Sequence, residues 1–332
     1  MSAVRPLPHA PRLHVDYVGD AGATSLAAQL AREDTLAVFG FGAAAPEHDD
    51  PRYLRVPLEP YGAAPLEVWR THGPVRTGRD GELNFAEDDA LHFGWMEVPE
   101  TDLGLEGASA FAYSRLLGWV RQRGFPHLLR SWNYLDAITE GDNDGERYRR
   151  FCVGRATGLG EVALGTLPAA TAIGRRDGVR TLQVYWLAAR APGVPVENPR
   201  QVSAYRYPRQ YGPQPPSFAR AMLPPSHDMP LLLSGTASVV GHESMHHDCV
   251  ESQLVETFAN FESLLVAARA QRPDLATRFG APSRLKVYVR DADAMPRIAQ
   301  ALATHLDPTV PRVLLHAAIC RRELRVEIDG VL

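Results

Sequence analysis

The sequence predicts an α+β fold built from two similar units, each with helices on one face of a mixed sheet. Two observations lead to this prediction: one order of strand and helix patterns occurs twice, and a long proline-rich connection separates the two copies. The 332 residues are 45% hydrophobic and 22% charged, which is typical of a globular chain and excludes a disordered or collagen-like one. We expect units at 1–190 and 229–332, joined by a connecting segment at 191–228 that contributes to the functional site.

The first copy begins with an apolar strand and continues with a helix whose large apolar side chains recur at helical spacing. A strand, a shorter helix and two further strands follow. The predicted elements are a strand at 91–98, a helix carrying Phe111, Leu116, Trp119 and Val120, a strand at 128–135, a helix at about 146–153, and strands at 167–173 and 181–188.

The connection between the copies is dense in proline, which fixes φ and lacks a backbone donor. Ala191 to Pro230 therefore predicts neither an ordinary helix nor a central strand. A connection this long is either functional or disordered. Its aromatic and arginine side chains favour a functional role.

The second copy repeats the order of the first with clearer periodicity. Leu254, Phe258, Phe261 and Leu265 follow one another at intervals of four, three and four residues, which places them on one helix face. The predicted elements are a strand at 230–235, this helix, a strand at 285–289, a helix at 293–306, and strands at 313–319 and 324–328. Two such units meet at a crevice, where we expect a ligand to bind.

Charge and cysteine usage narrow the functional classes. The net charge of −4 provides no positive field for nucleic acid or for an anionic membrane, so we expect neither partner. Cys152, Cys249 and Cys320 are far apart and form no CxxC pair, which favours a reducing compartment. The N-terminal segment has no apolar signal region, and no stretch is long enough to span a membrane. We therefore expect a cytoplasmic protein.

One short motif suggests a metal site. His242, Glu243 and His246 satisfy HExxH, the pattern in which two histidines of a helix bind zinc and the glutamate acts as a base. The motif precedes the periodic part of its helix, so we expect it in a loop between strand and helix. A polar loop or a helix cap is the alternative interpretation, and a zinc hydrolase stays open as a second function.

The C-terminal strand carries the more informative carboxyl group. Val326 and Ile328 alternate with Glu327 and Asp329, so one face of the strand is apolar and the other acidic. At the protein surface Glu327 would be an ordinary solvated side chain. In the crevice between the units it would be desolvated, and its pKa would rise toward the range of a general acid. Cys320 precedes this strand. Its ordinary structural interpretation is a thiol of the hydrophobic core.

Several segments together resemble the chorismatases. They are SGTASVVGHESMH, QLVETFANFESLL, LKVYVRD and AAICRRELRVEIDGV, with further likeness around Tyr148 to Arg155, Tyr205 to Pro208 and Tyr211 to Arg220. That family is distantly similar to the Rid family of enamine and imine deaminases, whose fold is chorismate-mutase-like. The resemblance implies two Rid-like units in this chain. It also leaves a Rid-like imine deaminase or small-molecule binder as an alternative function.

The resemblance implies cleavage of chorismate to pyruvate and a hydroxybenzoate without metal or organic cofactor. Within the family the likeness is to the hydroxybenzoate-forming enzymes, including the bifunctional one linked to xanthomonadin and ubiquinone precursors. Cys320 stands where family members that hydrolyse chorismate tend to have alanine, which favours 3-hydroxybenzoate, with 4-hydroxybenzoate as a further product. Leu233 and Ala237 are both candidates for a second position that determines the product.

Roles for further residues follow from the same resemblance. Glu327 would protonate the enolpyruvyl methylene group, and Cys320 would occupy the place of a competing water molecule. Arginines suit the two carboxylates of chorismate because a guanidinium group binds a carboxylate through two parallel hydrogen bonds. The candidates for substrate binding are Arg155, Arg220, Arg290, Tyr148, Tyr205, Tyr211 and Ala237. A duplicated unit is compatible with a monomer or a small homo-oligomer.

Overall fold

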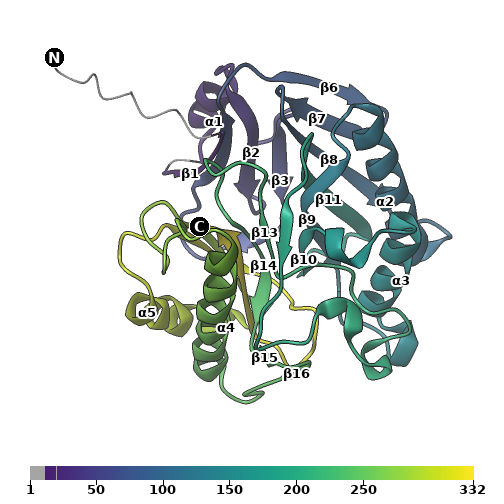
Figure 1. Cartoon of the computed structure of the whole chain (residues 1–332), viewed down its shortest axis with the longest axis vertical. Helices are drawn as coiled ribbons and strands as arrows, with labels where there is room; N and C mark the ends of the chain where they lie inside the picture. The colour runs from purple at the N-terminus through teal and green to yellow at the C-terminus, as the bar shows by residue number, and fades with distance from the viewer. Residues whose placement is uncertain (1–11, 20) are drawn as a thin grey trace.

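A computed structural model describes residues 12–19 and 21–332 (Figure 1). Most of the N-terminal segment considered above therefore lies outside the described residues. Within the described ranges the chain forms five α-helices and three larger sheets, so the predicted mixed α+β class is confirmed. In this part of the chain no helix is both long enough and apolar enough to cross a membrane.

A four-stranded sheet near the N-terminus was not predicted from the sequence. Its strand order is β1-β5-β2-β3, and the short helix α1 packs on one face through Leu26 and Leu30. Every residue of β2 is buried, because the opposite face of this sheet packs into the centre of the molecule. The elements are β1 (Leu13–Val18), α1 (Ala23–Leu30), β2 (Thr35–Phe41), β3 (Tyr53–Val56) and β5 (Leu66–Thr71).

A six-stranded sheet follows, with strand order β10-β9-β11-β8-β7-β6. The helices α2 and α3 cover one of its faces, on the right of Figure 1. Gly154 brings α3 close to α2, since a Cβ atom there would lie 2.1 Å from Glu106 O. The elements are β6 (Arg76–Asp80), β7 (Leu83–Glu87), β8 (Leu91–Pro99), α2 (Gly104–Gln122), β9 (His127–Asp136), α3 (Arg147–Leu159), β10 (Ala169–Arg175) and β11 (Thr181–Ala189).

Phe111 differs in burial from the other apolar residues named for its helix. Its side chain is 49% exposed, whereas Leu116, Trp119 and Val120 are buried. Five residues separate Phe111 from Leu116, and at 3.6 residues per turn this spacing turns the two side chains about 140° apart. Phe111 therefore lies on the outer face of α2.

The third sheet has seven strands in the order β12-β13-β14-β19-β17-β18-β4, and α4 and α5 cover one face (Figure 1). A separate hairpin, β15 with β16, follows β14. The elements are β4 (Glu59–Pro60), β12 (Val194–Val196), β13 (Ala221–Leu223), β14 (Leu232–Ala237), β15 (Val239–Val240), β16 (Glu243–Ser244), α4 (Val250–Gln271), β17 (Arg284–Val289), α5 (Met295–His305), β18 (Arg312–His316) and β19 (Val326–Val331).

The six- and seven-stranded sheets share one order of elements. Both run strand, helix, strand, helix, strand, strand, as the sequence predicts. In space the order β10-β9-β11-β8 matches β18-β17-β19-β14, and in each sheet the second and third strands of the series are parallel. The periodic patterns therefore located these helices and strands to within a few residues.

The proline-rich connection is more structured than expected. Two short strands, β12 and β13, extend the seven-stranded sheet at its edge. Ala221–Leu223 contains no proline and keeps its backbone donors, so it pairs with β14 inside the sheet. Three-residue 3₁₀ turns at Ala204–Arg206 and Arg209–Tyr211 occupy the remainder.

The two larger sheets meet at β10 and β14. The amide of Ala170 donates to Ser234 Oγ at 2.9 Å, and the amide of Gly235 donates to Thr171 Oγ1 at 3.0 Å. On the other side of this contact, large aromatic side chains of all three sheets form one central core. The contact between β10 and β14 brings residues of both halves of the chain to one place.

Candidate active site

A cavity of about 750 Å³ opens at the contact between β10, β14 and β19. Side chains from α3, the proline-rich connection and the loop between β18 and β19 form the rest of its wall. Its ionisable and amide lining residues are Asn133, Asp142, Asn143, Glu146, Tyr148, Arg149, Cys152, Arg155, Gln201, Tyr207, Gln210, Tyr211, Arg220, Cys320, Arg321, Arg322, Glu323 and Glu327. The volume suits a small organic molecule.

Glu327 lies on β19 and lines the cavity, although its residue surface is only 5% exposed. Gly235 makes room for it, because a Cβ atom at position 235 would lie 1.9 Å from Glu327 Oε1. Burial raises the pKa of Glu327 to about 8, and the nearby carboxylate of Asp329 adds to this increase. Glu327 therefore carries a proton at neutral pH and can donate it to a bound molecule.

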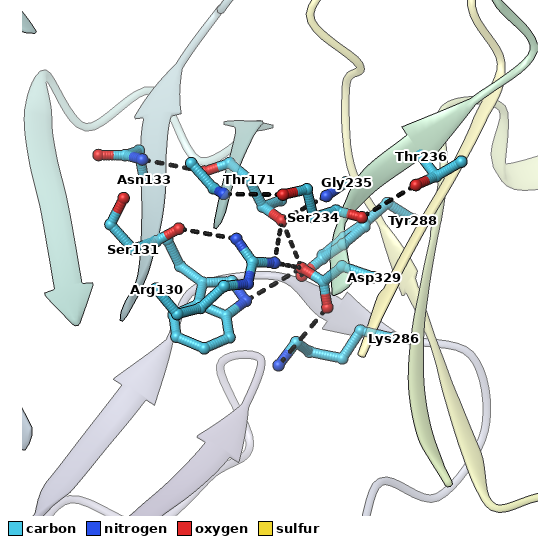
Figure 2. Close-up of polar contacts among 12 residues, drawn as sticks. Arg130, Ser131, Asn133, Thr171, Ser234, Gly235, Thr236, Lys286, Tyr288 and Asp329 are labelled. Atoms are coloured by element: carbon cyan, nitrogen blue, oxygen red, sulfur yellow. Dashed lines mark hydrogen bonds and ion pairs between the residues drawn. The ribbon is translucent and has the colours of Figure 1, made fainter. Parts of the chain in front are cut away.

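Asp329 lies two residues further along the same strand and face, and is fully buried. Figure 2 shows the donors that surround its Oδ2 atom. Thr171 Oγ1 donates at 2.7 Å, and Trp132 Nε1 and Tyr288 OH each donate at 3.0 Å. The buried guanidinium group of Arg130 lies 3.3 Å away and also donates to Thr171. Four donors from both halves of the chain therefore converge on one carboxylate oxygen of Asp329.

A second buried ion pair adjoins this network. Lys286 Nζ lies 3.7 Å from Asp329 Oδ1 and 3.1 Å from Glu67 Oε2. Burial alone would lower the pKa of Lys286, but the carboxylates of Glu67 and Asp329 outweigh it and raise this pKa. Lys286 is therefore an ammonium ion held between two acids.

Two of the predicted arginines line the cavity. Arg155, on α3, donates to Ser217 O and lies over the Tyr113 ring at 4.7 Å. Arg220 donates to Val202 O at 2.9 Å and to Tyr207 OH at 2.7 Å. The Nε atoms of both arginines are buried and make no hydrogen bond with the described residues. Both side chains are thus held by neutral groups, and neither forms one of the ion pairs found among the described residues.

Arg321 is a third cavity arginine, which the sequence did not single out. Its guanidinium group lies 4.0 Å from the Tyr211 ring centre and 5.1 Å from that of Tyr207. It also donates to His242 O at 2.9 Å and to Ser244 Oγ at 3.0 Å. These contacts hold a planar cation at the cavity wall, suited to a carboxylate.

Arg290 and Tyr205, by contrast, are absent from the described lining of the cavity. Arg290 binds Asp291 through two nitrogen atoms at 2.8 and 2.9 Å and donates to Arg322 O. The ring of Tyr205 lies beneath the guanidinium group of Arg206, its sequence neighbour. Arg321 is therefore better placed than Arg290 to meet a bound anion.

The other predicted residues reach the cavity. Tyr148, Tyr211 and Ala237 all line it, as do Cys152 and Cys320. Burial raises the pKa of Cys152 to about 12 and raises that of Cys320 well above its ordinary value. Both side chains are therefore neutral thiols that shape the cavity rather than nucleophiles.

The HExxH residues lie in the β15–β16 hairpin and the turn after it, outside any helix. His242 Nδ1 lies 3.3 Å from Tyr211 OH, whereas His246 Nε2 lies 3.3 Å from Glu256 Oε2. Glu243 is exposed. Since the motif has no helix to align its histidines, they turn to separate partners. Among the described residues no three His, Cys, Asp or Glu side chains are grouped to hold a metal ion.

Sequence reasoning missed Arg321, Tyr207, Thr171 and Arg130. Arg321 follows Cys320 directly, but nothing in the sequence distinguishes it from Arg322, which is 55% exposed. Thr171 and Arg130 lie in apolar strands, where an isolated polar residue gives no signal of a distant partner. Tyr207 belongs to the aromatic and arginine group of the proline-rich connection, so composition indicated its segment.

Comparisons with known proteins agree with this geometry. A family model described as "Chorismatase FkbO/Hyg5-like, N-terminal" matches residues 67–188. A chorismatase of Streptomyces hygroscopicus is 36% identical over 271 residues, covering 80% of this chain and 78% of that protein. A 3-hydroxybenzoate synthase of the same organism is 35% identical over 276 residues, covering 80% of each. A chorismatase crystal structure matches 98% of both chains with a TM-score of 0.84 and 32% identity.

Proposed function

Because this chain belongs to the chorismatase family, we propose that the cavity binds chorismate and that Glu327 is the acid that starts its cleavage. The reaction is the cleavage of chorismate to pyruvate and a hydroxybenzoate. The observation that carries the proposal is the state of Glu327: it is buried, it faces the cavity and its pKa is about 8. A carboxylic acid in this state can deliver a proton that an exposed carboxylate has already lost.

The proton goes to the methylene carbon of the enolpyruvyl group. Its addition forms the methyl group of pyruvate and leaves an oxocarbenium-like carbon, which makes pyruvate a better leaving group. Breakage of the ring carbon–oxygen bond then releases pyruvate with the ether oxygen. Attack by the neighbouring ring hydroxyl gives an arene oxide that opens to 3-hydroxybenzoate, and loss of a ring proton gives 4-hydroxybenzoate instead. All atoms of chorismate are then found in the two products.

Three arginines suit the two carboxylates of chorismate. Arg155 and Arg220 each have a buried Nε atom with no hydrogen-bond partner in the described part of the chain, and Arg321 lies against Tyr207 and Tyr211. Guanidinium groups held in place bind carboxylates with less loss of side-chain freedom than mobile ones. We infer that these three cations hold the dianion with its enolpyruvyl group toward Glu327.

Cys320 is proposed to control the fate of the activated ether. It lines the same cavity as Glu327, and its neutral thiol neither attacks nor ionises there. A side chain larger than alanine at this position fills space that a water molecule would otherwise occupy. Water is thereby kept from the oxocarbenium-like carbon, and the ring rearrangement to a hydroxybenzoate is favoured.

The domain boundaries are also part of the proposal. We propose two Rid-like units at 1–190 and 229–332, with 191–228 as a connection that supplies Tyr207, Tyr211 and Arg220 to the cavity. The matching order of four strands in each of the two larger sheets supports this division. We further propose a cytoplasmic enzyme, a monomer or small homo-oligomer that binds no nucleic acid, in keeping with the net charge of −4.

The test is to incubate EDTA-treated protein with chorismate, to separate the aromatic acids by chromatography and to assay pyruvate in the same sample. We expect one pyruvate for each hydroxybenzoate formed. Glu327→Gln should lower kcat/KM by about 100- to 10,000-fold, because it has the shape of the acid without its proton. Chorismate recovered unchanged from the wild-type reaction, or full activity in Glu327→Gln, would contradict the proposal.

A further inference from the structure

Five ionisable side chains form a chain of buried neighbours from the four-stranded sheet to the cavity. Glu67 is 2% exposed, Lys286 3%, Asp329 0%, Arg130 0% and Glu327 5%. They come from β5, β17, β19 and β9, and Glu67 and Lys286 are separated by 219 residues. Removing so many charged groups from water is costly unless their charges balance.

The net charge of this cluster of five side chains depends on one proton. If every group of this cluster is ionised, three carboxylates face two cations and the cluster has an excess negative charge. One proton on a carboxyl group makes it neutral. Glu67 accepts hydrogen bonds from Trp69 Nε1 at 2.8 Å and from Lys286, and Asp329 accepts them from three neutral donors and Arg130. Within the described chain no hydrogen bond reaches the Glu327 carboxyl group, so the proton belongs there.

We propose that the Glu67–Lys286 ion pair is a positioning element for the reaction: acting through Asp329, it determines which carboxyl group of the buried cluster holds the proton and so keeps Glu327 in its acid form. This inference rests on the proposed role of Glu327 and extends it to two residues outside the cavity. Glu67 opposes the positive charge of Lys286. Without Glu67, Lys286 and Arg130 would balance Asp329 and an ionised Glu327 together.

Other charged and titratable groups face this cluster. Tyr288 donates to Asp329, and its hydroxyl also contacts Tyr134 OH at 3.1 Å, which contacts Tyr185 OH at 3.2 Å. Tyr17 also faces Glu67 and Asp329, and its hydroxyl donates to Leu285 O at 3.0 Å. Burial raises the pKa of all four tyrosines, so they stay neutral. On the cavity side, the groups facing Glu327 are Arg220, Arg321, Cys320 and Tyr148. Arg220 and Arg321 place further positive charge on the cavity side of Glu327. The charge count therefore applies to the five buried residues behind the cavity, and it predicts the direction in which each variant moves the proton.

Charge counting predicts opposite effects for the two single variants. In Glu67→Gln, two carboxyl groups face two cations, the cluster is neutral with Glu327 ionised, and the proton is held less tightly. In Lys286→Met, three carboxyl groups face one cation, and Glu327 keeps its proton to higher pH. In the double variant two carboxyl groups face one cation, and the balance of the wild type returns.

The test is the pH profile of kcat/KM for chorismate, whose high-pH limb reports loss of the essential proton from the free enzyme. We expect this limb to lie about half a pH unit or more lower in pH in Glu67→Gln, and higher in pH by a similar amount in Lys286→Met. In the double variant it should return toward the wild-type pH. Lys286→Arg should leave the limb in place. Glu87→Gln removes another buried acid, which lies on β7 and pairs with Arg123 at the end of α2, outside the cavity lining, and it should not move the limb.

Infrared titration of the substrate-free protein gives a second measurement that does not depend on turnover. The protonated carboxyl band that is absent from Glu327→Gln should titrate with the same opposite displacements. A structural role alone would lower activity in both single variants and leave both titrations in place, which would overturn the inference. An active Glu327→Gln would instead overturn the proposed function. If one single variant fails to fold, the double variant and the remaining single variant still test the relation.

Discussion

Gly235 on β14 lies directly against the carboxyl group of Glu327 on β19. A Cβ atom at position 235 would lie 1.9 Å from Glu327 Oε1 and 3.3 Å from Thr171 Oγ1. The missing side chain is therefore the space that the proposed acid occupies. The amide of Gly235 also binds Thr171, which in turn donates to Asp329. One glycine thus makes room for Glu327 and joins the two sheets beneath it.

Gly235→Ala should therefore displace Glu327 and lower kcat/KM by about 100-fold or more, since a general acid acts only within hydrogen-bond reach of its target. The backbone at Gly235 lies outside the left-handed region, so the effect is steric and not conformational. Steady-state assays with chorismate measure it. Gly118→Ala on α2 is the matched control, because its added Cβ meets no atom within 4 Å. Equal activity in the two variants would show that Glu327 does not need this space.

The raised pKa of Glu327 also predicts how stability depends on pH. An unfolded glutamate has a pKa near 4.5, whereas the folded value is about 8, so the folded protein holds a proton that the unfolded chain releases. The stabilisation is complete below pH 4.5 and is lost as pH rises through about 8. Glu327→Gln lacks this dependence. Between pH 5 and pH 9 the wild type should lose roughly 2–4 kcal/mol of unfolding free energy relative to this variant.

Urea unfolding of the two proteins at a series of pH values measures this difference. All other ionisable groups are common to both proteins, so the effect of their titration cancels when the two stability curves are subtracted. Two stability curves that run parallel from pH 5 to pH 9 would show that the Glu327 carboxyl group has an ordinary pKa in the folded protein.

The sequence predicted most helices and strands of the two larger sheets because their apolar side chains recur at local periods. Alternation with Val326 and Ile328 placed Glu327 on the acidic face of its strand but left a surface position open, and its predicted role came from the resemblance to the chorismatases. The four-stranded sheet was missed because its packing depends on contacts between distant segments, such as Trp69 with Trp132, whose ring centres are 5.4 Å apart. The pairing of Glu67 with Lys286 likewise spans 219 residues and leaves no local pattern.

The choice between arginines shows the same limit within the site. Arg290 and Arg321 each occupy a loop beside a strand of the seven-stranded sheet, and the sequence does not say which loop faces the cavity. Arg321→Met should raise KM for chorismate by about 10- to 100-fold, the loss expected for one charge-assisted contact. Arg290→Met, which loses its pair with Asp291 outside the cavity lining, should change KM less than about threefold. The opposite ranking would restore Arg290 as the binding residue. Melting temperatures of both variants separate binding from folding.

Cys320 gives the most direct test of how the cavity selects its product. In Cys320→Ala the cavity gains the volume of one sulfur atom beside Glu327. The thiol then no longer fills the space that a water molecule can occupy. Water should then capture part of the oxocarbenium-like carbon, so the dihydroxy-cyclohexadiene acid should appear at the expense of hydroxybenzoate, while pyruvate release continues. Chromatography of the products measures the ratio. Cys249→Ser, at an exposed thiol outside the cavity lining, should leave the ratio unchanged. An unaltered ratio in Cys320→Ala would mean that other groups exclude the water.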